Sequence, residues 1–250
     1  MMDSKVTIEA RHAPYTHAEL RRLLDPSSIA IVGSSPRKGT FGQRVTANLG
    51  AYAGQVFHVN ARYQEIDGQA CYPSTAALPQ VPDCAVIVVG REHAAGLAEE
   101  CADAGVGGAI VFASGYAETG AAEDRREQER LTAIARGSRL RIIGPNSLGI
   151  INFASGAGLT FQPSPPVVPQ ARHSIGLISQ SGALGVSLAQ AAHRGVSFSH
   201  MLTSGNSCDV DVADYVSFLA DDPACGVIAC AFEGVASPQR LIEAARRAWA

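Results

Sequence analysis

The chain has 250 residues, of which 46% are hydrophobic and 17% charged, and its formal net charge is −3. This length predicts one large or two modest domains, with enough apolar material for a core. The slight acidic excess argues against nucleic-acid binding, which needs a basic surface. No stretch reaches the ~18 consecutive apolar residues of a membrane span, and residues 1–14 lack the apolar core of a signal peptide. We therefore expect a cytoplasmic protein with no membrane partner.

Six cysteines are spread along the chain without a C-x-x-C pair or an accompanying histidine cluster. This distribution is typical of reduced, mostly buried thiols in a reducing compartment. A zinc site or a disulfide framework is the less favoured alternative, so we predict no metal site.

Short apolar runs alternate with helical patterns through the first 150 residues. The expected helices are 16–24, 43–49, 92–105 and 122–136. The expected strands are 28–32, 55–60, 83–90, 108–113 and 140–143, with a short extended piece at 66–72. This alternation predicts an α/β fold with a Rossmann-like parallel sheet and helices on both faces. Ligands of such sheets bind beyond the carboxyl ends of the strands, so the loops there form the candidate site.

The loop after the first strand, Gly33 to Gly42, has the composition of a phosphate-binding loop. Three glycines, two serines and the start of a helix coincide in it. Glycine lets the backbone approach a ligand, and the free N–H groups at a helix start attract anions. Arg37 and Lys38 either pair with a phosphate or are simply solvated. The structural alternative is a turn that only reverses the chain.

The expected ligand of this loop is not NAD. An NAD-binding Rossmann site needs G-x-G-x-x-G after the first strand and an acidic residue at the end of the second. Here Ser35 takes the place of the second glycine, and the second strand ends in Asn60. An NAD-linked oxidoreductase is therefore a disfavoured alternative.

A stretch with four prolines, 161–172, predicts a linker between two domains, 1–160 and 173–250. The strand–turn–helix pattern then begins again. The expected strands are 174–179, 197–202 and 226–232. The expected helices are 183–193, 211–219 with Asp209 or Asp211 as its cap, and a last one that Ser237 caps and Pro238 begins. Three strand–helix units are few for a complete sheet, so we expect the second domain to be truncated in this chain.

Five motifs, in order, resemble the NDP-forming acyl-CoA synthetases of the ADP-forming acetate–CoA ligase and succinyl-CoA synthetase α-subunit type. They are L-L-D-P-S-S-I-A-I-V-G-S-S (23–35) with the glycines at 39 and 42, G-P-N-S-L-G-I-I-N (144–152), S-Q-S-G-A-L-G (179–185), S-G-N-S-C-D-V-D-V-A-D (204–214) and F-E-G-V (232–235). The resemblance covers residues 23–249 and implies a CoA-binding domain followed by a flavodoxin-like domain. It also implies a reaction in which a carboxylic acid, CoA and NTP give acyl-CoA, NDP and phosphate through an acyl-phosphate and a phosphohistidine.

The resemblance also implies the site residues. Those expected to hold the phosphates of CoA are Gly33, Ser34, Ser35, Lys38, Gly39 and Gly42. Those expected to line the rest of the CoA groove are Asn60, Val89, Gly90, Ala113, Ser114 and Gly115, with Pro145 and Asn146 near the thiol. Those expected to bind phosphate or the acyl carboxylate are Ser179, Ser181, Gly182, Gly205 and Asn206. Glu233 would orient the phosphohistidine, because a carboxylate beside an imidazole fixes its tautomer.

Each of these motifs also has a plain structural interpretation. Residues 144–147 can be a turn, Ser179 or Ser181 an ordinary helix cap, and Glu233 an acid that flanks a helix. His58, His193 and His200 are expected to be structural or exposed rather than catalytic.

The sequence departs from the family in several places. Ala61 stands where the family usually has proline, and Ser147 replaces a common cysteine. None of the seven histidines matches the family's Ser-His-Thr-Gly motif, and no ATP-grasp domain is recognisable. We therefore expect the chain to bind CoA and a carboxylic acid but not to turn over alone. ATP or ADP with Mg²⁺ would be bound by ligase domains supplied in cis or as a β-subunit, in an oligomer; the alternative is a non-catalytic CoA- or nucleotide-binding regulatory protein.

Overall fold

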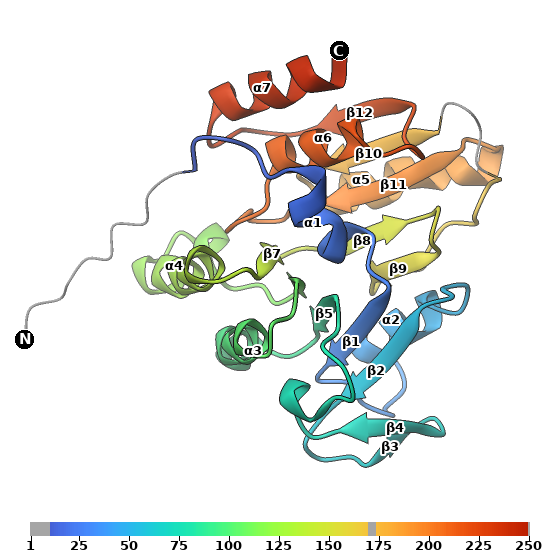
Figure 1. The fold of residues 1–250 in the computed structure, drawn as a ribbon, viewed down its shortest axis with the longest axis vertical. Coiled ribbons are helices and arrows are strands. Elements are labelled where there is room, and N and C mark those ends of the chain that lie inside the picture. Colours follow the sequence, from blue (N-terminus) through green and yellow to red (C-terminus); the bar gives the residue numbers. More distant parts are fainter. Residues whose placement is uncertain (1–10, 170–173, 250) are drawn as a thin grey trace, which may run out of the picture.

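The computed structural model describes residues 11–169 and 174–249, and it forms two sheets with helices around them (Figure 1). The strand order is β3-β4-β2-β1-β5-β6-β7 in the seven-stranded sheet and β12-β10-β11-β8-β9 in the five-stranded sheet. The seven-stranded sheet is mostly parallel and the five-stranded sheet is mixed, and helices follow the parallel strands, so the predicted α/β fold class is confirmed. The expectations for residues 1–10, for the end of the proline-rich stretch at 170–172 and for residues 173 and 250 lie outside the described residues.

The first sheet follows the predicted strand–helix alternation. Its strands are β1 (Ser28–Val32), β2 (Gln55–Val59), β3 (Glu65–Ile66), β4 (Gln69–Tyr72), β5 (Cys84–Ile87), β6 (Gly108–Val111) and β7 (Arg141–Ile143). Its helices are α1 (His17–Leu24), α2 (Phe41–Asn48), α3 (Arg91–Asp103) and α4 (Ala122–Gly137). Short 3₁₀ turns lie at Thr75–Ala77 and Ala117–Thr119. Strands β1, β2, β5, β6 and β7 pair in parallel, and the β3–β4 hairpin extends the sheet beyond β2.

Strand β1 is buried along its whole length, which shows that the sheet is covered on both faces at this strand. Because alternate side chains of a strand point to opposite faces, Ile29 and Ile31 join one hydrophobic cluster and Ala30 and Val32 another. The cluster around Ala30 and Val32 contains side chains of α3 and α4. The apolar run of β1 is continuous because both faces of the strand are buried. A strand with one face in water would alternate apolar and polar residues.

The second sheet contains two strands that the sequence analysis does not predict, β8 (Gly149–Asn152) and β9 (Ala157–Thr160). Its other strands are β10 (Ile175–Ser179), β11 (Phe198–Thr203) and β12 (Val227–Ala231), and its helices are α5 (Gly182–Ala189), α6 (Val212–Ala220) and α7 (Pro238–Trp249), with a 3₁₀ turn at Gln190–Arg194. Strand β8 pairs antiparallel with both β9 and β11. The change of sheet therefore falls between β7 and β8, and the expected first domain, 1–160, contributes two strands to the second sheet.

The two sheets share one hydrophobic cluster rather than being joined only by a linker. Leu20, Leu23 and Leu24 of α1 belong to the same cluster as Ile178 of β10 and Phe218 of α6. Figure 1 shows α1 between the two parts of the molecule. Apolar packing through α1 thus holds the two sheets together.

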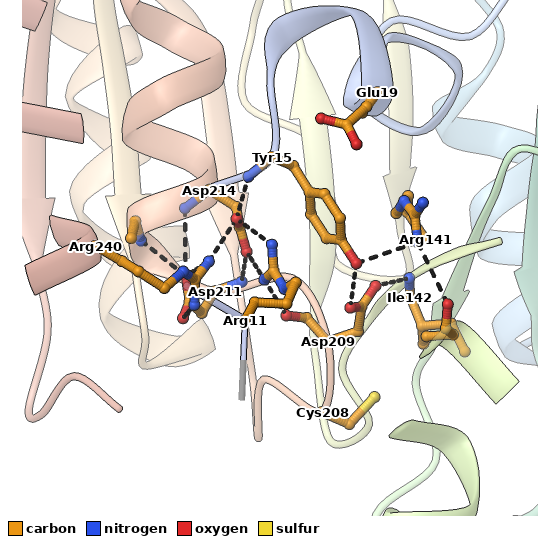
Figure 2. Close-up of polar contacts among 12 residues, drawn as sticks. Arg11, Tyr15, Glu19, Arg141, Ile142, Cys208, Asp209, Asp211, Asp214 and Arg240 are labelled. Atoms are coloured by element: carbon orange, nitrogen blue, oxygen red, sulfur yellow. Dashed lines mark hydrogen bonds and ion pairs between the residues drawn. The ribbon is translucent and has the colours of Figure 1, made fainter. Parts of the chain in front are cut away.

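A buried polar network ties residues before α1 to the start of α6 (Figure 2). The Asp214 carboxylate is fully buried and accepts hydrogen bonds from the Tyr15 N–H at 2.8 Å, from Arg11 Nη1 at 2.8 Å and from Arg240 Nη2 at 2.6 Å. Burial alone would raise the pKa of Asp214, but the hydrogen bonds and charge of Arg11, together with the charge of Arg240, hold it below its usual value. Asp211 caps α6, as the sequence predicts, and accepts a hydrogen bond from the Asp214 N–H.

A second branch of this network reaches the first sheet. Asp209 accepts hydrogen bonds from Tyr15 Oη at 2.8 Å and from the Ile142 N–H of β7 at 3.1 Å. The guanidinium of Arg141 lies over the Tyr15 ring, 4.3 Å from its centroid. The acidic motif at 209–214 therefore makes structural contacts that link the two sheets.

All six cysteines are free, and four of them are buried. Across the described ranges, no helix combines the length and the apolar composition needed to cross a membrane. His58 and His200 are buried, and His193 lies on the surface.

His200 makes stability depend on pH. Burial lowers its pKa to about 4, although Asp222 Oδ2 lies 3.9 Å from its Nε2. An unfolded imidazole has a pKa of about 6.5. The unfolded state therefore binds the extra proton between pH 6.5 and 4, and stability falls as the pH is lowered through that window.

The free energy of unfolding falls between pH 7.5 and 4.5, and we expect this fall to be about 2–3 kcal/mol smaller in His200→Leu than in the parent protein. Neither ring nitrogen of His200 has a hydrogen-bond partner among the described residues, so leucine leaves no hydrogen bond broken. Urea denaturation at several pH values measures the effect, and the difference at pH 7.5 reports the packing cost alone. Equal pH slopes for the two proteins would contradict the prediction.

Candidate functional site

The loop between β1 and α2 passes close to the end of β5 and leaves part of its backbone open. Gly33 has φ +93°, and a Cβ there would lie 2.4 Å from Cγ1 of Val89. At Gly42 a Cβ would lie 3.3 Å from the Cα of Ser34, so this glycine lets α2 pack against the loop. Gly39 has φ +80° and no heavy atom within 4 Å of the Cβ position. The loop thus presents an open glycine backbone beside the start of a helix, which suits a phosphate group.

Ser34 faces the sheet and not the ligand side of this loop. Its Oγ lies 2.8 Å from His58 Nδ1, its N–H donates to the Val59 carbonyl at 3.2 Å, and its carbonyl accepts from Asn60 Nδ2 at 2.7 Å. Burial lowers the pKa of His58, so the ring is neutral at pH 7 and can pair with the hydroxyl as shown. Residues of β2 and its following turn therefore hold all three polar groups of Ser34, and its hydroxyl shapes the loop.

We expect Ser34→Ala to lower the free energy of unfolding by about 1–3 kcal/mol, because it leaves a buried imidazole nitrogen unpaired. The double variant Ser34→Ala/His58→Leu should recover most of that loss, since both polar partners are removed together. Chemical denaturation of the two variants tests this, with the more exposed Ser35→Ala as control. A Ser34→Ala variant that lost ligand affinity at unchanged stability would show that the hydroxyl contacts the ligand instead.

Two cavities lie along the carboxyl edge of the first sheet and meet at Val89, which lines both. The first, of about 700 Å³, is lined by the predicted residues Gly33, Asn60 and Val89. The second, of about 610 Å³, is lined by the predicted residues Gly39, Val89, Gly90, Ala113, Ser114 and Asn146. Among the predicted CoA-binding residues, those that line neither cavity are Ser34, Ser35, Lys38, Gly42, Gly115 and Pro145, and the predicted residues of the second sheet line neither.

The cavities also contain side chains that the sequence analysis does not single out. Arg62, His93 and Arg130 line the first cavity. Phe41, Phe112 and Phe161 line the second. Arg62 follows the second strand in the sequence and is a recognisable candidate there, whereas the three phenylalanines are far apart in sequence and meet only in the fold.

The predicted loops of the two sheets contact each other. The Asn206 N–H donates to the Pro145 carbonyl at 2.9 Å, and Asn146 Nδ2 donates to Asn206 Oδ1 at 3.2 Å. Gly205 has φ +57°, and a Cβ there would lie 2.5 Å from the Pro145 oxygen. The 144–147 and 204–207 loops therefore form one junction at the end of the second cavity.

The start of α5 adjoins this junction. Ser181 caps α5 by accepting a hydrogen bond from the Leu184 N–H, and Ser179 Oγ donates to the Ser181 carbonyl at 2.6 Å. A Cβ at Gly182 would lie 2.5 Å from Cγ of Leu148, which lines the second cavity. The free N–H groups of α5 thus begin next to the 144–148 loop and favour an anion there.

Glu233 follows β12, next to the turn that follows β10. Its N–H and that of Gly234 donate to Gln180 Oε1 at 2.8 and 3.0 Å. The Glu233 residue is exposed. These two hydrogen bonds bring the 180 and 233 loops together. The two cavities leave room for an extended, phosphate-bearing ligand along the first sheet toward these loops.

Comparison with known families agrees with this arrangement. Residues 27–152 match the model of the CoA binding domain, and residues 172–250 match that of the succinyl-CoA ligase like flavodoxin domain. The chain is 36% identical over 240 residues to a trans-feruloyl-CoA synthase from an unidentified prokaryote, covering 94% of this chain and 34% of that protein. It is 35% identical to the alpha subunit of ADP-forming acetate–CoA ligase II from Pyrococcus furiosus, covering 89% of this chain and 48% of that subunit.

A solved structure has the same fold. The dinucleotide-forming acetyl-coenzyme A synthetase 1 of Ca. Korarchaeum cryptofilum, in complex with phosphate and ADP, aligns with a TM-score of 0.84 and 33% identity over 92% of this chain and 49% of that one. The chain thus spans half or less of the length of these relatives. Its two matched domains and its ordered motifs show that the chain belongs to the NDP-forming acyl-CoA synthetase family, with a CoA-binding domain followed by a succinyl-CoA ligase-like flavodoxin domain.

Proposed function

We propose that this chain is the CoA-binding part of an acyl-CoA synthetase that makes acyl-CoA from a carboxylic acid, CoA and NTP through acyl-phosphate and phosphohistidine intermediates. The observation that supports this most directly is the pair of cavities that meet at Val89. Together they form a path from the glycine loop after β1 to the junction with the second sheet. A ligand with phosphates at one end and a reactive group at the other fits such a path.

The residues present fit CoA. The open backbone at Gly39 would take its phosphates, with Gly33, Ser35 and Lys38 beside it. Asn60, Val89, Gly90, Ala113 and Ser114 would line the path, and Asn146 would lie near the thiol. Ser34, Gly42, Gly115 and Pro145 would support the path without lining it.

The loops of the second sheet would handle the acyl group. The N–H groups near Ser181 and Gly182, together with Gly205 and Asn206, would bind a carboxylate or a phosphate. Ser179 would hold the turn through its bond to the Ser181 carbonyl. Glu233 would orient a phosphohistidine that approaches from outside the sequence seen here.

We further propose that the other catalytic parts, which bind ATP or ADP with Mg²⁺, act together with this chain in cis or as a second subunit. Two relatives from Pyrococcus furiosus are described as subunit alpha, which supports the second arrangement. The relatives are named for different acids, including acetate, ferulate and 4-hydroxybutyrate, so membership of the family does not by itself specify the acyl group.

Calorimetric titration of the chain with CoA tests the proposal. We expect saturable one-to-one binding at micromolar to submillimolar CoA, and no comparable binding of NADH. Absence of binding at millimolar CoA would overturn the proposed function.

A further inference from the structure

Three phenylalanines from separate parts of the chain form an aromatic cluster in the second cavity. Phe41 begins α2, Phe112 follows β6, and Phe161 follows β9. The rings of Phe41 and Phe161 are stacked, with centroids 4.1 Å apart and planes at 16°. The Phe112 ring meets Phe161 edge-on at 5.0 Å and Phe41 edge-on at 6.2 Å.

This cluster remains accessible from the cavity. Phe112 is buried, whereas Phe41 is 43% exposed although it contacts two other rings. Val88 and Leu148 add apolar surface to the same cavity. Its volume of about 610 Å³ falls within the range of small-molecule sites, roughly 300–1,000 Å³.

The cluster lines the cavity that adjoins the loops of the second sheet. Asn146, the residue assigned to the thiol end of CoA, lines the same cavity, as does Ser147. Leu148 connects the cavity to the start of α5, where Gly182 packs against it. A group attached to the sulfur of CoA would therefore enter the cavity that the phenylalanines line.

We infer that this cavity receives an aromatic acyl group, so that the substrate is an aryl-substituted carboxylic acid; this rests on the proposed CoA site. Aromatic rings attract each other in offset-stacked and edge-to-face arrangements, beyond the gain from burying apolar area. The exposed face of Phe41 offers a stacking surface, and the cluster already has both types of ring contact. An aliphatic acyl chain would gain only the apolar burial.

The test measures the affinity of the chain for four ligands by calorimetry, namely CoA, acetyl-CoA, octanoyl-CoA and phenylacetyl-CoA. Octanoyl and phenylacetyl groups contain the same number of carbon atoms, so the pair isolates the effect of the ring. We expect phenylacetyl-CoA to bind at least about tenfold more tightly than acetyl-CoA and about threefold or more tightly than octanoyl-CoA.

Two variants locate the effect. Phe41→Leu and Phe161→Leu, made separately, should each reduce the affinity for phenylacetyl-CoA about fivefold more than the affinity for CoA. Phe57→Leu is the matched control, because Phe57 lies on β2 against Tyr72 and lines neither cavity. Circular dichroism confirms that each variant is folded.

The outcomes separate the two proposals. If no CoA compound binds, both proposals are overturned. If CoA and acetyl-CoA bind but phenylacetyl-CoA binds no more tightly than octanoyl-CoA, the aromatic inference alone is overturned. If both phenylalanine variants reduce the affinity for CoA as much as that for phenylacetyl-CoA, the cluster contacts the pantetheine arm, and the inference is again wrong.

Discussion

Asp214→Asn is expected to lower the free energy of unfolding by about 3–5 kcal/mol, because it breaks a buried ion pair from one side. Asp214 has no exposed side-chain surface, and the charges of Arg11 and Arg240 both converge on its carboxylate. An asparagine would leave the Arg11 guanidinium without its paired carboxylate in a poorly solvated place, and Arg240 with Asp211 alone. It would also weaken the junction that ties the residues before α1 to α6. Denaturation followed by circular dichroism measures the loss.

Asp221→Asn is the matched control. Asp221 also pairs with an arginine, Arg247, but both side chains are more than one-third exposed. Exposed pairs contribute about 0–1 kcal/mol, so this variant should be close to the parent protein. Equal losses at the two positions would mean that the buried network does not stabilise the fold more than a surface pair does.

Gly39→Val is expected to reduce the affinity for CoA by at least about 100-fold. Two effects act together at this position. Gly39 has φ +80°, which a β-branched residue adopts only with strain. It also lines the second cavity with nothing within 4 Å of its Cβ position, so a valine side chain would occupy space that the ligand needs. Calorimetric titration with CoA measures the effect.

Gly120→Val separates the strain from the lost space. Gly120 has nearly the same backbone conformation, φ +82°, and also nothing within 4 Å of its Cβ position, but it lines neither cavity. We expect its CoA affinity to equal that of the parent protein, at a similar cost in stability. Unchanged CoA affinity in Gly39→Val would show that this glycine is not part of the CoA site.

Local sequence features predicted most of the first sheet. The apolar run 28–32 is strand β1 with the same bounds, and the prediction of a helix after Gly42 is close to α2. Capping rules also hold for α6, where Asp211 accepts hydrogen bonds from two N–H groups of the first turn. These predictions succeed because burial on both faces, helix periodicity and capping depend on residues close together in the chain.

Strands β8 and β9 were not predicted, because their positions depend on residues far apart in the chain. Each has only four residues, and β8 is placed by its antiparallel pairing with β11, about fifty residues further along the chain. The proline-rich stretch suggested a boundary after residue 160, whereas the sheets already change after β7. Long-range pairing of this kind leaves no local periodicity.

Several of the motif residues line the cavities, but the motifs did not predict the direction of each side chain. Gly33, Gly39 and Asn146 line the cavities, while the hydroxyl of Ser34 turns inward to His58. Their roles in binding CoA stay predictions that the titrations above address.

Local patterns in the sequence were enough to predict the α/β class, the order of strands and helices in the first sheet, and the family, because glycine loops, apolar runs and caps act over a few residues. The tertiary structure alone brings the 144–147 and 204–207 loops together, buries Asp214 against Arg11 and Arg240, and gathers Phe41, Phe112 and Phe161 in one cavity. Those contacts join residues tens to hundreds of positions apart. Their geometry follows from how two sheets pack around α1, which no local pattern specifies.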